Sequence, residues 1–258
     1  SIAAITSDPV LKSMLSTLEA DIYAALYSSS RWKYDARNLP LTPLPDDYRE
    51  WSGDQFRMKI NSLIDSALQA APELKAAPLK TYSSVLSLGK SVGVRNETEI
   101  YYPTLFDFVS NKAISLLQST GRMDNILSWG LLTRHDLYLT VQFNRFDATA
   151  AKILDIYASL LRFHSSVSAP FILTDINRLD FITCHVWNSG DDTPSPAERK
   201  TELLLDLYNE CRTSEYSGDI LLAINSNPQN TKKWLAEAIR HNLKAYPAFR
   251  RNNNLKNT

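Results

Sequence analysis

A run of apolar segments over residues 126–187 constrains the fold of this chain more than any other feature. Two strand-like runs, an amphipathic helix and two further strand-like runs follow one another there. The second run alternates, with Leu137, Leu139, Val141 and Phe143 on one face. A side-chain period of two is typical of a strand that buries one face. The segment therefore predicts a mixed sheet.

The order of elements defines the expected fold class, which is α/β with an α+β leaning. We expect strands at residues 126–133, 137–143, 170–175 and 179–187, a helix at 148–163 after the cap Asp147, and a further short apolar run at 220–224. Helices should flank this mixed sheet, and the N-terminal half should be helical.

Local signals define the helices of the N-terminal half. Asp8-Pro9 suits a helix start, because Asp accepts from free amides and Pro at the first position lacks only an unused donor. Ser52-x-x-Gln55 has the form of a capping box and predicts a second helix. An apolar helical stripe follows Pro9, formed by Val10, Leu11, Met14, Leu15, Leu18, Ile22 and Leu26. A third helix is expected over residues 103–118, and Trp32, Tyr34, Leu39, Leu41 and Leu44 should be buried beside a proline-rich crossover.

Length and composition suit one large globular domain. The chain has 258 residues, of which 44% are apolar and 22% charged, both ordinary values for a globular protein. We expect a single domain, 1–258, with a helical part (8–120), an α/β core (121–225) and a C-terminal basic helix and tail (230–258). With only seven glycines, a glycine-rich phosphate-binding loop is not expected.

Positive charge is concentrated at the C-terminus, although the net charge of the chain is zero. From Thr231 onward, seven basic residues face Glu237 alone. Cations interleaved with aromatic side chains suit single-stranded nucleic acid or a polar head group at a membrane surface. The candidate nucleic-acid-binding residues are Lys232, Lys233, Arg240, Lys244, Arg250 and Arg251. The alternative is an ordinary helix that buries its apolar stripe and leaves these cations in solvent.

Cysteine usage bears on the cellular compartment. Cys184 and Cys211 are too few for a disulfide scaffold or a four-cysteine zinc site, and they suggest reduced thiols in a cytoplasmic or nuclear protein. No apolar run reaches the length that spans a bilayer. Because the first residue is not Met, a removed leader, and with it secretion, remains an open alternative.

The succession of elements over residues 97–187 resembles the core of the PD-(D/E)XK nuclease family. The segment Asp155–Leu161 is also loosely similar to one in N-terminal domains of fungal kinase-like proteins and of some effector proteins. The family triplet would fall on Gln142-Phe143-Asn144, which offers neither a carboxylate nor a lysine. The resemblance therefore implies a degenerate, inactive copy.

Two residues carry the alternative, an active metal-dependent nuclease. Under the resemblance, Glu99 (or Glu97) would match the helix carboxylate and Asp136 the first strand acid. They would bind Mg²⁺ or Mn²⁺ with further ligands from elsewhere in the chain. Otherwise Asp136 simply ends a hairpin, and no cofactor is expected.

The remaining titratable residues favour structural roles. Arg134, His135 and Asp136 suit a solvated turn. Cys184 and His185, as strand neighbours, would point to opposite faces and could not act as a pair, and Cys184 should be a small buried residue. We therefore predict a non-catalytic intracellular interaction domain that binds a protein or nucleic-acid partner, with no catalytic residues assigned.

Overall fold

The computed structural model describes residues 6–82, 84–86, 97–123, 127–187 and 194–225, together with Arg240. Contacts divide the chain into two compact units, one of Ser1–Ser87 with Tyr102–Arg122 and one of Leu88–Tyr101 with Met123–Thr258. That they form the single domain expected from the sequence stays a prediction.

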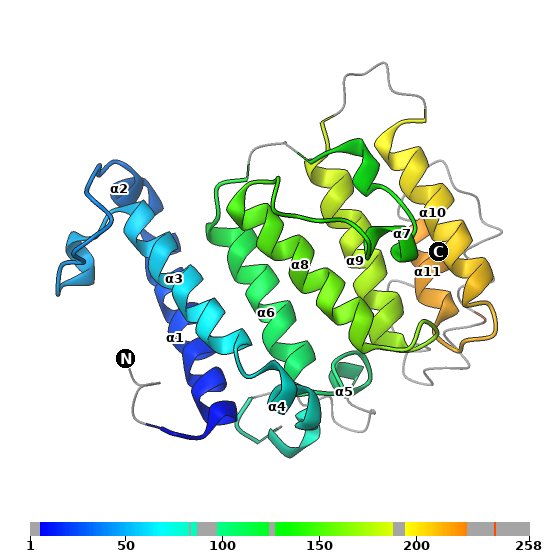
Figure 1. Ribbon diagram of the computed structural model, residues 1–258, viewed down its shortest axis with the longest axis horizontal. Helices are drawn as coiled ribbons and strands as arrows, with labels where there is room; N and C mark the ends of the chain where they lie inside the picture. Colours follow the sequence, from blue (N-terminus) through cyan, green and yellow to red (C-terminus); the bar gives the residue numbers. More distant parts are fainter. Residues whose placement is uncertain are drawn as a thin grey trace. The chain divides into compact units, whose positions relative to one another are not determined.

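The first unit is a set of helices arranged around α1. Its helices are α1 (Pro9–Ser29), α2 (Arg31–Asp35), α3 (Gly53–Leu68), α4 (Ala71–Ala76) and α6 (Leu105–Thr120), with the short 3₁₀ turns η2 (Tyr48–Glu50) and η3 (Leu79–Tyr82). α1 packs most extensively on α3 and next on α6 (Figure 1). The backbone of residues 77–79 joins that of residues 103–105 through two hydrogen bonds, which tie the start of α6 to the end of α4.

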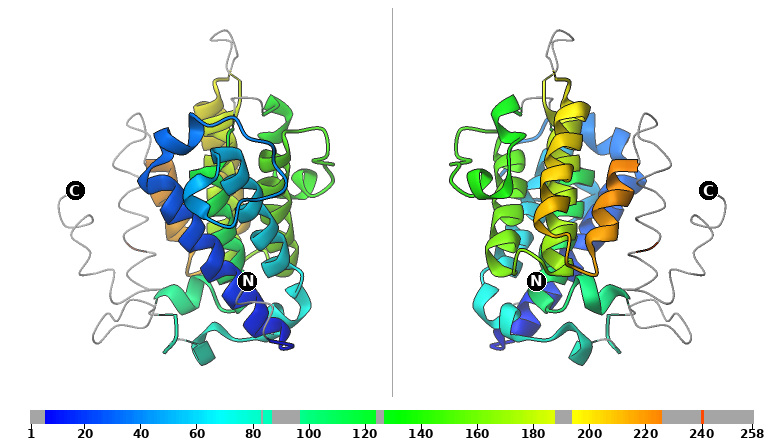
Figure 2. Two further views of the ribbon diagram at one scale, coloured as in Figure 1. Left: turned by 90° about the vertical axis from the view of Figure 1, so that its left-hand side faces the viewer. Right: turned by 90° about the vertical axis from the view of Figure 1, so that its right-hand side faces the viewer.

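The second unit is also helical among the residues described. Its helices are α5 (Glu97–Tyr101), α7 (His135–Tyr138), α8 (Ala148–Phe163), α9 (Ala169–His185), α10 (Pro196–Glu210) and α11 (Ser217–Asn225), with the 3₁₀ turn η4 (Trp129–Leu131). α9 is central, since α5, α8, α10 and α11 all contact it. α11 (orange) also lies beside α10 (yellow) in the right-hand view of Figure 2.

The predicted α/β fold with a mixed sheet from residues 126–187 is wrong. In the described part of the chain, extended pairing is limited to the isolated bridges Pro78–Thr104 and Leu127–Val186. The expected strands at 170–175 and 179–187 lie almost wholly in the one helix α9, and the run at 220–224 lies in α11. A short apolar run has the same composition in a buried helix as in a strand, so its period cannot decide between them.

A buried ion pair lies where the two expected strands were separated. The expected strands 170–175 and 179–187 leave a gap at Ile176, Asn177 and Arg178. In the structure Arg178 has no exposed surface, and its Nε lies 2.7 Å from Oδ1 of Asp175, one helical turn earlier. Its guanidinium also donates to the carbonyl oxygen of Thr133 (3.0 Å). The charge is therefore paired inside the helix, and the helix continues.

The alternating run after Asp136 is likewise not a strand. His135–Tyr138 forms one helical turn, and the side chains that become buried are Tyr138 and Phe143, from opposite faces of the expected strand. Their ring centroids are 5.1 Å apart. Burial raises the pKa of Tyr138, whose hydroxyl donates to the carbonyl oxygen of Leu154 (2.6 Å). Leu137, expected on the buried face, is exposed.

Helix starts that were predicted from local chemistry are confirmed. Asp8 caps α1 by accepting from the amides of Val10 and Leu11, and Pro9 is the first helical residue. Ser52 and Gln55 form both hydrogen bonds of the capping box at α3. Asp147 caps α8, whose bounds match the expected 148–163. These signals act within one turn, so the global fold does not alter them.

An aromatic cluster with a buried arginine closes one end of the first unit. Tyr27, Tyr34, Trp51 and Phe56 pack together, whereas Trp32, which we expected to be buried, is 81% exposed. Leu39 and Leu41 are exposed as well.

The Asp35 carboxylate at the edge of this cluster accepts hydrogen bonds from three side chains, Tyr27, Arg57 and, at 3.4 Å, Arg31. The Arg57 guanidinium lies 3.0 Å from Asp35, and the Tyr27 hydroxyl donates to the same carboxylate at 2.9 Å. Burial opposes ionisation of Asp35, but the hydrogen bonds from Tyr27 and Arg57 outweigh it and hold the pKa of Asp35 below its ordinary value. The pairing fixes the short helix α2 against the start of α3.

Gly53, the first residue of α3, leaves room for that carboxylate. A Cβ at this position would collide with the Asp35 carboxylate and lie 3.2 Å from Nη2 of Arg57. We predict that Gly53→Ala lowers the free energy of unfolding by about 1–3 kcal/mol, measured by urea denaturation. Gly130→Ala is the control, since a Cβ there meets only Oγ of Ser128 at 3.7 Å. Equal stability of the two variants would contradict this account.

Candidate functional site

The candidate site of the first unit depends on an unusual distribution of side-chain size around α1. The buried face of this helix carries small residues: Ser13, Ser16, Thr17, Ala20 and Ala24, with Tyr27 at the end. A face of small side chains lets two helix backbones approach closely. Here it lies against α3 and α6, which are the main neighbours of α1.

The hydroxyl groups on this buried face are paired. Ser13 Oγ donates to the carbonyl oxygen of Ala67 near the end of α3, at 2.7 Å. Thr17 Oγ1 donates to the carbonyl oxygen of Ser13 within α1 (2.9 Å), and Ser16 Oγ lies 3.3 Å from Oγ of Ser66. Because buried polar groups destabilise a fold only when they lack partners, these serines fit an interior position.

Three large apolar residues of α1 lie on the opposite, outward face. Leu11, Leu18 and Ile22 are 44%, 56% and 50% exposed, and Leu15 between them is half-buried. We call these four residues the outer face of α1. The apolar stripe predicted from the sequence therefore exists, but much of it is the solvent side of the helix. A helix that is apolar on both sides normally has neighbours on both sides.

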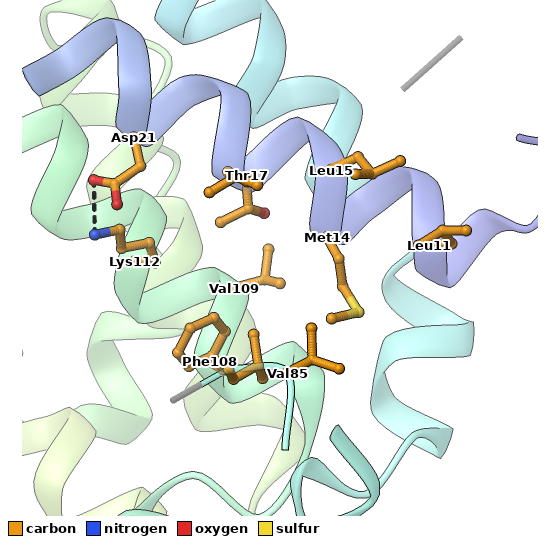
Figure 3. Close-up of a pocket in the computed structure, with 11 residues that line it drawn as sticks. Leu11, Met14, Leu15, Thr17, Asp21, Val85, Phe108, Val109 and Lys112 are labelled. Carbon is orange, nitrogen blue, oxygen red and sulfur yellow. Dashed lines mark ion pairs between the residues drawn. The ribbon is translucent and has the colours of Figure 1, made fainter. Parts of the chain in front are cut away.

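An apolar groove runs beside the outer face, between α1 and α6. Its volume is about 430 Å³. Figure 3 shows Met14 of α1 directed toward Val85 and Phe108, with Val109 of α6 also facing the hollow. The remaining lining residues are Leu11, Leu15, Thr17, Leu18, Asp21, Leu86 and Lys112. The surface offered to a ligand is thus almost wholly hydrocarbon and thioether.

One ion pair marks the polar end of the groove. Nζ of Lys112 on α6 lies 2.8 Å from Oδ1 of Asp21 on α1 (Figure 3). Both side chains are partly exposed, so the pair adds little stability, and the charges of the described lining residues cancel. Among the residues that line the groove, none is a histidine, a cysteine or a second carboxylate. This chemistry suits apolar binding rather than acid–base or metal catalysis.

The residues proposed for a metal site lie on two different short helices. Glu99 lies on α5, half-buried, and Asp136 lies on α7, where its carboxylate accepts from the Leu137 amide at 2.9 Å. That hydrogen bond lowers the pKa of Asp136. No group of three potential metal ligands occurs among the described residues. Gln142-Phe143-Asn144 follows α7 in non-strand structure, and the side chain of Glu97 lies outside the described part.

His135 is less solvated than the turn expected from the sequence. Its side chain is 16% exposed, with Nδ1 3.8 Å from Asp175 and Nε2 3.8 Å from Glu210. Arg134 Nη2 lies 2.6 Å from the other oxygen of Glu210. With Arg178 on Asp175, each carboxylate has a permanent cationic partner. The arrangement joins α7 to α9 and α10, and we interpret it as structural.

Most of the candidate nucleic-acid-binding residues lie outside the described part of the chain. Of the six, only Arg240 is described, and it is exposed. The others are Lys232, Lys233, Lys244, Arg250 and Arg251. Cys184 and His185 are consecutive residues of the helix α9 rather than of a strand, and Cys184 is exposed, so its expected burial is wrong. Nδ1 of His185 lies 2.7 Å from the carbonyl oxygen of Phe181.

Comparison with known proteins gives no family for this chain. No protein-family model matches it, and neither does any curated protein or solved structure. Within the described residues, no helix is both long and apolar enough to cross a membrane. The groove and the outer face of α1 are the features of the described residues that bear on function, and the sequence did not predict either of them. The available signal was the row of Ser and Ala residues opposite the leucine stripe.

The close packing of α1 predicts unequal effects of one substitution at two alanines. Ala20 has no exposed surface, whereas Ala25 is exposed on the same helix. We expect Ala20→Leu to lower the free energy of unfolding by about 1–3 kcal/mol, because the added atoms separate α1 from its neighbours. Ala25→Leu should change it by less than about 0.5 kcal/mol. Urea denaturation of both variants provides the test, and a tolerated Ala20→Leu would contradict the packing.

Proposed function

We propose that this protein is a non-catalytic interaction module that binds an apolar helix of a protein partner. The partner helix occupies the groove and the outer face of α1. The observation that carries this proposal is the exposure of Leu11, Leu18 and Ile22 beside a hollow that is also apolar. Contiguous apolar surface of this kind typically marks an interaction site.

The shape and chemistry of the site favour a helical ligand. Recognition of a helix in a groove uses large apolar side chains that recur every three or four residues on the ligand. α1 and α6 form the two walls, and their side chains leave a hollow of about 430 Å³ that such anchors can enter. Met14 adds an unbranched, adaptable side chain, which suits a surface that must fit another protein.

The cysteines support a cytoplasmic or nuclear setting for this module. Cys184 is an exposed free thiol and Cys211 a buried one. Burial raises the pKa of the Cys211 thiol to about 11, so this group stays protonated and unreactive near neutral pH. An exposed thiol persists best in a reducing compartment.

A designed peptide tests the binding site. The probe is a fluorescein-labelled helix with leucine at every third and fourth position and balanced Lys and Glu elsewhere. We expect saturable binding to the full chain by fluorescence anisotropy, and a loss of roughly tenfold or more in affinity for Leu18→Glu, because a carboxylate would enter the apolar contact.

The matched control is Leu137→Glu. Leu137 in the second unit is also 56% exposed and does not line the groove, so the same charge is introduced at the same exposure outside the proposed site. It should bind the peptide like the unmodified chain. The proposal fails if the unmodified chain shows no saturable binding, or if both variants lose affinity equally.

A further inference from the structure

The outer face of α1 has the spacing of a coiled-coil seam. Leu11, Leu15, Leu18 and Ile22 are separated by four, three and four residues. This is the repeat that places apolar side chains along one line of a helix for pairing with a second helix. The line runs opposite the small-residue face, so a second helix can lie on it without disturbing the contact between α1 and α3.

The seam is complementary to itself when two copies run antiparallel. In that arrangement Leu11 lies across from Ile22 of the second copy, and Leu15 lies across from Leu18. Every large side chain then meets another large side chain, and the two copies are related by a two-fold axis. Closed two-fold pairs of this kind are the commonest protein oligomers.

Charges beside the seam favour the same orientation. Lys12 and Glu19 lie on one flank of the seam, at corresponding positions of successive repeats. An antiparallel pair brings Lys12 of each copy toward Glu19 of the other, giving two opposite-charge contacts. Lys12 is exposed, whereas the Glu19 side chain is 14% exposed and lies 3.5 Å from Nζ of Lys59, so Lys12 of the second copy would join an existing ion pair. A parallel pair would instead place Glu19 beside Met14.

The opposite flank adds no unmatched charge. Asp21 is the acidic residue there, and Lys112 of the same chain neutralises it at 2.8 Å. The groove borders this flank and extends the apolar surface beyond the four seam residues.

We propose that the helix bound by this site is α1 of a second copy of the chain, in an antiparallel pair centred between Leu15 and Leu18. This inference rests on the proposed function and names its partner. The seam has only two heptads, and α1 with its 21 residues is about 31 Å long, so the interface is small. Pairing is therefore weak, with a dissociation constant in the micromolar range or above.

Sedimentation velocity of the full chain, from low micromolar to near-millimolar concentration, tests self-association. We expect the weight-average sedimentation coefficient to rise from monomer to dimer with concentration. Leu18→Glu and Ile22→Lys should each raise the dissociation constant at least about tenfold, while Leu137→Glu should leave it unchanged. Circular dichroism checks that each variant is folded. Two seam variants are used so that the test still stands if one of them fails to fold.

The results distinguish this inference from the proposed function. A chain that stays monomeric at every concentration overturns the inference. If that monomer still binds the designed peptide through Leu18, the proposed function stands and only the identity of the partner is wrong. A dimer that Leu18→Glu and Ile22→Lys leave intact overturns the inference as well, because the contact then lies elsewhere.

Disulfide trapping tests the orientation. Leu15→Cys and Leu18→Cys are prepared separately, each with Cys184→Ser to remove the exposed native thiol, and are mixed under mild oxidation. An antiparallel pair predicts that the mixture cross-links faster than either variant alone, because position 15 faces position 18. Faster cross-linking of each variant with itself would indicate a parallel pair and overturn the proposed geometry.

Discussion

The close contact between α1 and α3 determines what the first unit presents to its surroundings. Ser13 and Ser16 hydrogen-bond directly across the contact, while Ala20 and Ala24 contribute no bulk. The small side chains let α3 pack closely on one face of α1, and large apolar side chains on the opposite face lie outside the core, whereas Leu26 packs against the aromatic cluster. Leu11, Leu18 and Ile22 therefore remain on the outside, and the binding surface follows from the packing.

In both units a buried arginine is paired with carboxylates. Arg57 is held among Asp35, Asp54 and Tyr27, and Arg178 is held by Asp175 over the ring of Tyr138, 4.5 Å from its centroid. Such an arginine contributes little net stability, but removal of its partner is costly because a buried charge is left alone. Both clusters join short elements, α2 and α7, to long helices. None of these groups faces the groove.

The sequence predicted the structure where the determining interaction is local. The caps at Asp8, Ser52 and Asp147 involve amides two or three residues away, and the structure confirms them. The sheet was wrong because runs such as those within Ala169–His185 suit a buried helix as well as a strand. Arg178 separates the two apolar runs in the sequence, and its burial in a pair with Asp175 is not apparent from the apolar pattern.

The candidate site was missed for a related reason. Periodicity locates an apolar stripe on a helix, but it does not say which side meets the core. On α1 the core lies on the side of Ser13, Ala20 and Ala24, and this depends on how closely α3 approaches. The most direct measurement is thiol labelling of dilute, monomeric Leu18→Cys and Ala24→Cys chains that also carry Cys184→Ser. The account predicts labelling of Leu18→Cys near the rate of an unfolded thiol and strong protection of Ala24→Cys, whereas equal rates or the reverse order would contradict it.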